Sequence, residues 1–351
     1  MRPRRTSPAP QPPPGATLPG RCWAAANVGA LASCLTLAGC QAPTRPPLVI
    51  AADGVLCDLG QRLAGPELRL RCLLEPGQDP HNLRLTPQQS QELRGARRVL
   101  VNGYGLSPAL ERSPGAIAVA ERAVPASPLI EAEHGNRDPH VWHDPRQAQA
   151  LVRLVANELS AVAAGSTVNS TVNPEASAAL QRRATALQQV LLDLDRWNRE
   201  QLATLPAAAD GGPPVLATDH RAYASFARAY SLRELPLVDS ASTSDTLRPA
   251  ALATTLQRLK ALKVRQLFRE PGPPGKILQR LSALSGIPIS PTPLTLDGLA
   301  SGPPNLIATL VSNTCAVSVG LGGHCDRGSG ARLIARWQAI GPGETRTDPA
   351  R

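Results

Sequence analysis

Short apolar segments alternate with helical segments along most of this 351-residue chain. In the first half, residues 47–51, 68–74 and 98–102 are predicted strands, and residues 55–63 and 87–95 are predicted helices. Parallel strands need a crossover between them, usually a helix, so this alternation predicts parallel sheets flanked by helices. The chain is therefore expected to have an α/β fold.

The second half repeats the pattern after a long helical segment. Strands are predicted at residues 214–218, 235–238, 266–269 and 287–289, and helices at 220–231, 247–262 and 275–285. Within residues 174–205, leucines recur near steps of three, four and seven, which predicts one amphipathic helix about 45 Å long. The length of the chain exceeds that of a typical single domain, so we expect two lobes.

The N-terminus has the pattern of a signal peptide. Arg2, Arg4 and Arg5 precede an apolar stretch at residues 26–38, which ends in Leu37-Ala-Gly-Cys40. This stretch is shorter than the roughly 20 residues that a transmembrane helix needs. Leu-Ala-Gly-Cys is similar to a bacterial lipobox, so Cys40 is expected to be lipidated as the first mature residue. That places the protein outside the cytoplasm on a lipid anchor. The alternative is a disordered leader with an accidental apolar run.

The charge of the chain gives no sign of a nucleic-acid partner. The net charge of +10 falls to +6 without residues 1–40, which contain four arginines and no acidic residue. Aromatic residues make up 3% of the chain, and no helix carries a basic run. The basic character is therefore that of a solvated surface.

The cysteines favour an exported protein with disulfides. Cys22 and Cys34 would leave with the leader and Cys40 would carry lipid, so an even number of free cysteines would remain: Cys57, Cys72, Cys315 and Cys325. Cys315 and Cys325 flank a glycine-rich turn and are the predicted pair. Cys57 and Cys72 either pair or are buried as small apolar residues. A zinc knuckle made by Cys315, His324 and Cys325 lacks a fourth ligand nearby.

Three of the six histidines lie in separate loops between predicted elements. They are His81, His140 and His220. His81 and His220 follow predicted strands, at the ends where α/β sheets place their ligands. Neutral imidazole is a common ligand of zinc and related metals, so these loops predict a metal site; the alternative for each histidine is polar surface.

The sequences around these histidines resemble a known family. The motifs are Asp79-Pro-His-Asn-Leu, Asp138-Pro-His-Val-Trp-His-Asp-Pro145, Thr218-Asp-His-Arg-Ala-Tyr223 and Pro293-Leu-Thr-Leu-Asp-Gly-Leu299. In this order, they resemble the metal-binding segments of the zinc and manganese substrate-binding proteins of bacterial ABC importers. The resemblance covers about residues 48–310.

The resemblance implies a ligand set and a division of the chain. His81, His140, His220 and Asp297 would bind one divalent metal ion in a cleft between two lobes, and residues 174–205 would form a helix that spans both. The expected parts are a signal peptide (1–40), an N-terminal lobe (41–173), this helix, a C-terminal lobe (206–340) and a tail (341–351). The implied partners are an ABC permease and its ATPase, with the protein itself a monomer.

Two other side chains are candidates near this site. Glu270 is an alternative fourth ligand or a partner of a ligand. His143 is a further candidate metal residue, which either orients a ligand or is a surface or rim histidine. The segment around His134 resembles only a short remnant of the histidine-rich loop of some zinc-specific members of that family.

The predicted function is high-affinity capture of a divalent metal outside the cytoplasm and its delivery to a permease. Three imidazoles favour zinc over manganese, and no organic cofactor is expected. Affinity should fall with pH near 6.5, the ordinary imidazole pKa. One alternative is an exported zinc hydrolase with Glu270 as general base, although no His-Glu-x-x-His motif is present. Another is a metal-binding surface or adhesin protein without a permease.

Overall fold

A computed structural model describes residues 45–74, 77–131, 136–165, 174–238, 249–302 and 305–342. The predicted signal peptide, Cys40, His134 and most of the predicted tail lie outside these residues. Within the described ranges, no helix combines the length and the apolar character needed to cross a membrane.

The first sheet has four parallel strands in the order β2-β1-β3-β4. Its strands are β1 (Leu48–Ala51), β2 (Arg69–Cys72), β3 (Arg98–Val101) and β4 (Ala116–Ala118). The accompanying helices are α1 (Gly54–Leu63), α2 (Pro87–Gly95), α3 (Pro108–Glu111), α4 (Val119–Ala123) and α5 (Pro145–Ala164). We call this sheet with α1 to α5 the first lobe.

An antiparallel pair, β5 (Leu129–Glu131) and β6 (Asn136–Arg137), precedes α5. Two short 3-10 helices, η1 (Pro80–Asn82) and η2 (Val141–His143), lie in the loops that carry His81 and His140. Asp144 caps α5 by accepting a hydrogen bond from the Arg146 amide, and Pro145 occupies the first helical position.

The second sheet has three parallel strands in the order β8-β7-β9. They are β7 (Val215–Thr218), β8 (Arg233–Pro236) and β9 (Leu267–Phe268), with helices α7 (Ala224–Ala229), α8 (Pro249–Ala261) and α9 (Lys276–Ser285). We call these elements the second lobe. The predicted strand at residues 287–289 is only a single bridge between Leu267 and Ile289. The α/β prediction, with two mainly parallel sheets flanked by helices, is confirmed.

A long helix, α6 (Pro174–Leu202), contributes to both lobes. Leu180, Leu187 and Leu194 are buried in the core of the first lobe. Leu202, at the other end of the helix, packs with Phe226 of the second lobe. The helix ends three residues earlier than predicted.

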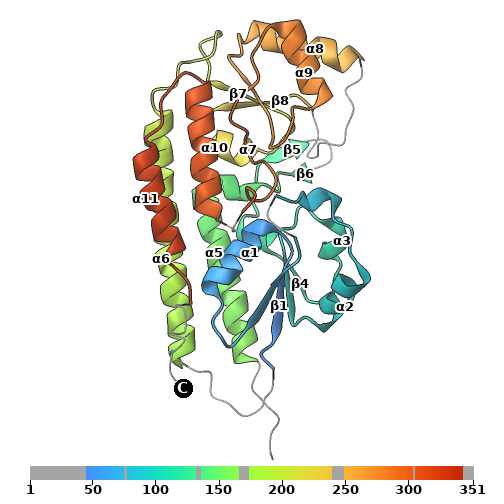
Figure 1. The fold of residues 1–351 in the computed structure, drawn as a ribbon, viewed down its shortest axis with the longest axis vertical. Helices are drawn as coiled ribbons and strands as arrows, with labels where there is room; N and C mark the ends of the chain where they lie inside the picture. The colour runs from blue at the N-terminus through green and yellow to red at the C-terminus, as the bar shows by residue number, and fades with distance from the viewer. Residues whose placement is uncertain are drawn as a thin grey trace, which may run out of the picture. The chain divides into compact units, whose positions relative to one another are not determined.

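Two C-terminal helices, α10 (Leu306–Gly320) and α11 (Arg327–Gln338), lie beside α6 (Figure 1). Their residues Leu306 and Trp337 belong to the core of the first lobe. The buried carboxylate of Asp58 in α1 accepts hydrogen bonds from the Leu306 amide and from Trp337 Nε1, both at 2.8 Å. These two helices, which were not predicted from the sequence, thus complete the core of the first lobe, and Ala316 and Val317 of α10 also pack in the core of the second. The predicted lobe boundaries stay a prediction.

Two disulfides connect neighbouring elements. Cys57 in α1 is bonded to Cys72 in β2. Cys315 in α10 is bonded to Cys325, just before α11.

Candidate metal centre

Four loops bring the predicted ligands together. His81 lies in η1, His140 directly precedes η2, and His220 follows β7. Asp297 lies in the loop between α9 and α10 and is followed by Gly298, whose φ of 75° is in the left-handed region that favours glycine. The prediction of a helix from residue 220 is wrong, because α7 begins at Ala224 and leaves His220 in the loop.

The three imidazoles converge on one carboxylate oxygen. Asp297 Oδ1 is 2.9 Å from His140 Nε2 and 3.4 Å from both His81 Nε2 and His220 Nε2. His140 and His220 are fully buried, and the side chains of His81 and Asp297 are 11% and 7% exposed. Among the described residues, neither His81 Nε2 nor His220 Nε2 has a hydrogen-bond partner. His81, His140 and Asp297 form one group of side chains that could hold a metal ion, and His220, Glu270 and Asp297 form a second group that shares Asp297.

His140 lies between two carboxylates. Its Nδ1 is 2.9 Å from Asp138 Oδ1, and its Nε2 is 2.9 Å from Asp297 Oδ1. Burial lowers the pKa of His140, but these hydrogen bonds and charges outweigh burial and raise the pKa to about 10. Burial raises the pKa of Asp297, and the three imidazoles hold it well below its ordinary value. Without a metal ion, the His140 ring therefore carries protons on both nitrogens.

Glu270 faces the other nitrogen of His220. Its Oε1 is 3.7 Å from His220 Nδ1, and its amide donates to Asp219 Oδ2. Burial and the nearby carboxylates of Asp297 and Asp219 raise the pKa of Glu270 to about 8. With Asp79 and Asp297, Glu270 lines a cavity of about 220 Å³ beside the imidazoles.

His143 is not a surface or rim histidine, and that interpretation is wrong. It is 1% exposed, and its Nε2 donates to the Leu296 carbonyl at 2.9 Å. Its ring stacks on Tyr223 with 4.5 Å between the centroids. Burial lowers the pKa of His143 to about 4, so the ring is neutral. Its contact supports the backbone next to Asp297, and His143 belongs to neither group of potential ligands found in the described residues.

Sequence reasoning did not assign a role to Asp138, which is fully buried and bonded to His140. The signal was present, because an Asp-Pro pair precedes both His81 and His140. In both places the aspartate accepts a hydrogen bond from the histidine amide, at 2.8 Å for Asp79 and 2.9 Å for Asp138.

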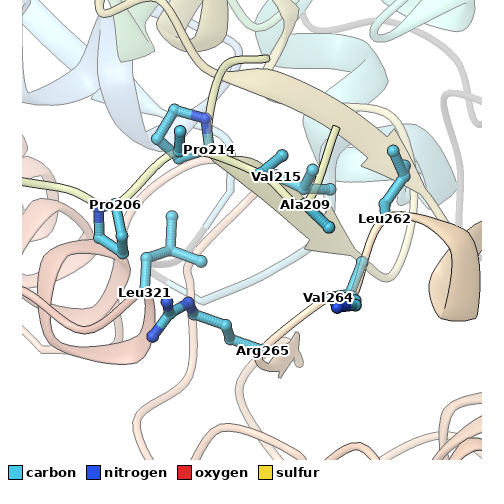
Figure 2. A pocket seen from close by; sticks show the side chains of 11 residues that line it. Pro206, Ala209, Pro214, Val215, Leu262, Val264, Arg265 and Leu321 are labelled. Carbon is cyan, nitrogen blue, oxygen red and sulfur yellow. The ribbon is translucent and has the colours of Figure 1, made fainter. Parts of the chain in front are cut away.

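A second cavity, of about 130 Å³, lies at the opposite end of β7 (Figure 2). Val215, the first residue of β7, lines it, whereas His220 follows the last. The rest of the lining includes Pro206, Pro214, Leu262, Arg265 and Leu321. It contains none of the predicted site residues.

Comparison of the sequence with known proteins identifies relatives that bind metals. Residues 49–318 match the family model described as zinc-uptake complex component A periplasmic. The zinc-binding protein TroA of Treponema pallidum is 30% identical over 246 residues, which are 67% of this chain and 73% of TroA. The manganese-binding lipoprotein MntA of Bacillus subtilis is 27% identical over 225 residues, 62% of this chain and 68% of MntA.

Solved structures agree with the sequence matches. The periplasmic zinc binding protein TroA from Treponema pallidum superposes with a TM-score of 0.67 at 25% identity, covering 78% of this chain and 99% of TroA. The Fe(III)-bound YtgA from Chlamydia trachomatis has the same fold, with a TM-score of 0.68 at 22% identity over 80% of this chain and 99% of YtgA. The chain therefore belongs to the family of zinc-uptake complex component A periplasmic proteins.

Proposed function

We propose that this chain is the substrate-binding protein of an ABC importer and captures one divalent metal ion outside the cytoplasm. The proposed ligands are the Nε2 atoms of His81, His140 and His220 together with a carboxylate oxygen of Asp297. The observation that carries the proposal is the contact of all three Nε2 atoms with Asp297 Oδ1 at 2.9–3.4 Å in a buried site. Because the ligands come from both lobes, separating the lobes at the permease would disperse them and release the ion.

Zinc is the proposed cargo, ahead of manganese. Three imidazoles and one carboxylate suit four-coordinate zinc, whereas manganese sites favour more oxygen ligands. Asp297 is the proposed fourth ligand because it contacts every imidazole, while Glu270 contacts His220 on the opposite side of the ring. Glu270 is thus better suited to orient His220 than to bind the same ion.

An exported hydrolase is not supported. A catalytic zinc site keeps an open coordination position for water, and Asp297 lies where it would close that position. The relatives are named for metal binding, not for an enzymatic activity. The alternative of a surface protein without a permease differs from the proposal in its partner and not in its site.

Direct titration tests the ligand set. We expect chelator-treated protein to bind one zinc ion tightly and manganese more weakly. Substitution of a residue that only supports a metal ligand typically reduces metal affinity by roughly 10–100-fold. His81→Ala, His140→Ala and His220→Ala each remove a ligand and should reduce zinc affinity by more than that. Asp297→Ala should reduce it somewhat less. Competition with a chromogenic chelator measures each affinity.

His324→Ala is the matched control, because His324 is an exposed histidine just before α11. This variant should bind zinc as the wild type does. Full zinc affinity in all three of the other histidine variants would place the site elsewhere and reject the proposal.

A further inference from the structure

The buried carboxylate of Asp138 has hydrogen bonds to both of its oxygens. Oδ1 accepts from the His140 amide and lies 2.9 Å from His140 Nδ1. Oδ2 accepts from the Ser225 amide at 3.1 Å and from Ser225 Oγ at 3.0 Å. The side chain is fully buried, so these contacts replace all of its hydration.

The two oxygens bind different lobes. His140 directly precedes η2 and α5 of the first lobe, and the Asn102 side chain at the end of β3 fixes the loop by donating to the Pro139 carbonyl at 2.7 Å. Ser225 lies in the first turn of α7 in the second lobe. One carboxylate therefore joins a proposed ligand of the first lobe to a helix of the second.

Asp79 provides an internal comparison. It precedes His81 in the same Asp-Pro-His arrangement, and its Oδ1 also accepts from the histidine amide. Its Oδ2, however, accepts from Asn82 in the same short helix. The contacts of Asp79 therefore stabilise only its own loop.

We propose that Asp138 is a positioning residue that orients the His140 ring for the metal and couples that orientation to the closeness of the lobes. The inference rests on the proposed metal-binding function. An Nδ1–H donated to Asp138 leaves Nε2 as the atom that binds the ion. When the lobes separate, Ser225 leaves Oδ2, the carboxylate loses two of its hydrogen bonds, and its hold on His140 weakens. Lobe opening thus loosens a ligand of the first lobe as well as removing those of the second.

Two variants of the full mature chain test the two halves of the inference. Asp138→Asn keeps the size of the side chain but exchanges one acceptor oxygen for a donor, and should lower zinc affinity about 10–100-fold. Ser225→Ala leaves the bonds to His140 in place and removes one bond to the second lobe. It should speed zinc dissociation by about two- to tenfold, the effect of one hydrogen bond, with a smaller change in the association rate.

Asp326→Asn is the control, because Asp326 caps α11 at the surface and asparagine caps a helix as well as aspartate does, so this variant should leave both rates nearly unchanged. Nitrogen-15 NMR of the His140 ring gives a readout that a general loss of stability would not change. The zinc-bound wild type and Ser225→Ala should show a protected Nδ1–H signal, and Asp138→Asn should lose it.

The outcomes separate this inference from the proposed function. If Asp138→Asn binds zinc as tightly as the wild type while His140→Ala does not, the positioning role is rejected and the metal site stands. If Ser225→Ala releases zinc at the wild-type rate, the coupling to the second lobe is rejected. If His140→Ala also binds zinc normally, the proposed site itself fails. Should Asp138→Asn not fold, the Ser225→Ala dissociation rate still decides the coupling.

Discussion

At the scale of single residues, the most consequential feature is the pair of carboxylates around His140. With a pKa of about 10, the ring is doubly protonated at neutral pH in the metal-free protein. A metal ion can bind Nε2 only after the proton on that atom has left. Metal binding is therefore an exchange of a proton for a metal ion at this ring.

This exchange predicts a pH dependence. Between pH 7 and 8.5, which is below the pKa of His140, binding should release about one proton, and zinc affinity should rise by up to about tenfold per pH unit. Calorimetry in buffers of different ionisation enthalpy counts the released protons. An affinity that is constant above pH 7, with no proton released, would contradict the prediction. The pH dependence of zinc binding would then follow the ordinary imidazole pKa near 6.5.

The residues also show how much of the site could be predicted from the sequence. The motifs predicted which loops carry His81, His140, His220 and Asp297, and the structure brings the three imidazoles to the Asp297 carboxylate. The burial of His143 could not be predicted, because its partners, Leu296 and Tyr223, are distant in the sequence. The link from Asp138 to Ser225 spans 87 residues and is a property of the assembled lobes.

At the scale of single elements, α1 begins with a buried acidic cap. Asp53 Oδ1 accepts a hydrogen bond from the Leu56 amide, but Oδ2 has no partner among the described residues. Burial raises the pKa of Asp53 to about 6, because the charged form loses hydration. Since the unfolded state ionises at lower pH, the contribution of Asp53 to stability should decrease as pH rises from about 4 to 6 and should not recover above that range.

Asp53→Asn should remove this decrease. Asparagine retains the cap, so the variant should be more stable than the wild type at pH 7.5 by about 2–3 kcal/mol and of similar stability near pH 4. Urea unfolding of metal-free protein at both pH values measures the difference. Asp326→Asn is the control, because Asp326 caps α11 at the surface with a lowered pKa, and its replacement should not stabilise the protein. A destabilised Asp53→Asn would show that the ionised form is favoured.

The two disulfides predict a ranking of stability. Cys315 and Cys325 are 10 residues apart, and Cys57 and Cys72 are 15 apart. By the chain-entropy estimate, replacing Cys315 and Cys325 with alanine should cost slightly under 3 kcal/mol, and replacing Cys57 and Cys72 about 3 kcal/mol. Urea unfolding measures both. Free thiols at Cys315 and Cys325, found by peptide mapping of protein taken from the periplasm, would reject the Cys315–Cys325 disulfide.

At the scale of the whole molecule, the proposed lipid on Cys40 would hold the metal-binding protein at the membrane. We expect mass spectrometry of the membrane fraction to show a mature chain that begins with acylated Cys40, and Cys40→Ser to release the protein from the membrane. A chain that begins elsewhere, or a Cys40→Ser variant that stays bound, would reject the lipid anchor. Copurification of a permease and an ATPase with the anchored protein would separate an importer component from a surface protein that acts alone.

The fold class could be predicted from the sequence because each predicted strand and helix depends on residues that are close together in the chain, and these elements alternate. The packing of α10 and α11 could not, because it depends on contacts with distant segments, such as the bonds that Leu306 and Trp337 donate to Asp58. The sharing of α6 between the two cores likewise depends on contacts between distant segments.

The return of the C-terminal helices to Asp58 affects how the chain matures. Asp58 and Leu306 are 248 residues apart, so at about 5–20 residues per second roughly 10–50 s pass between their synthesis. During that interval α1 lacks the amide and the indole that satisfy its buried carboxylate. The core of the first lobe is therefore complete only after Leu306 and Trp337 have been made. This delay suits the export that we propose, because a translocase threads unfolded polypeptide. A ribosome that stops before Leu306 releases a product in which both halves are incomplete.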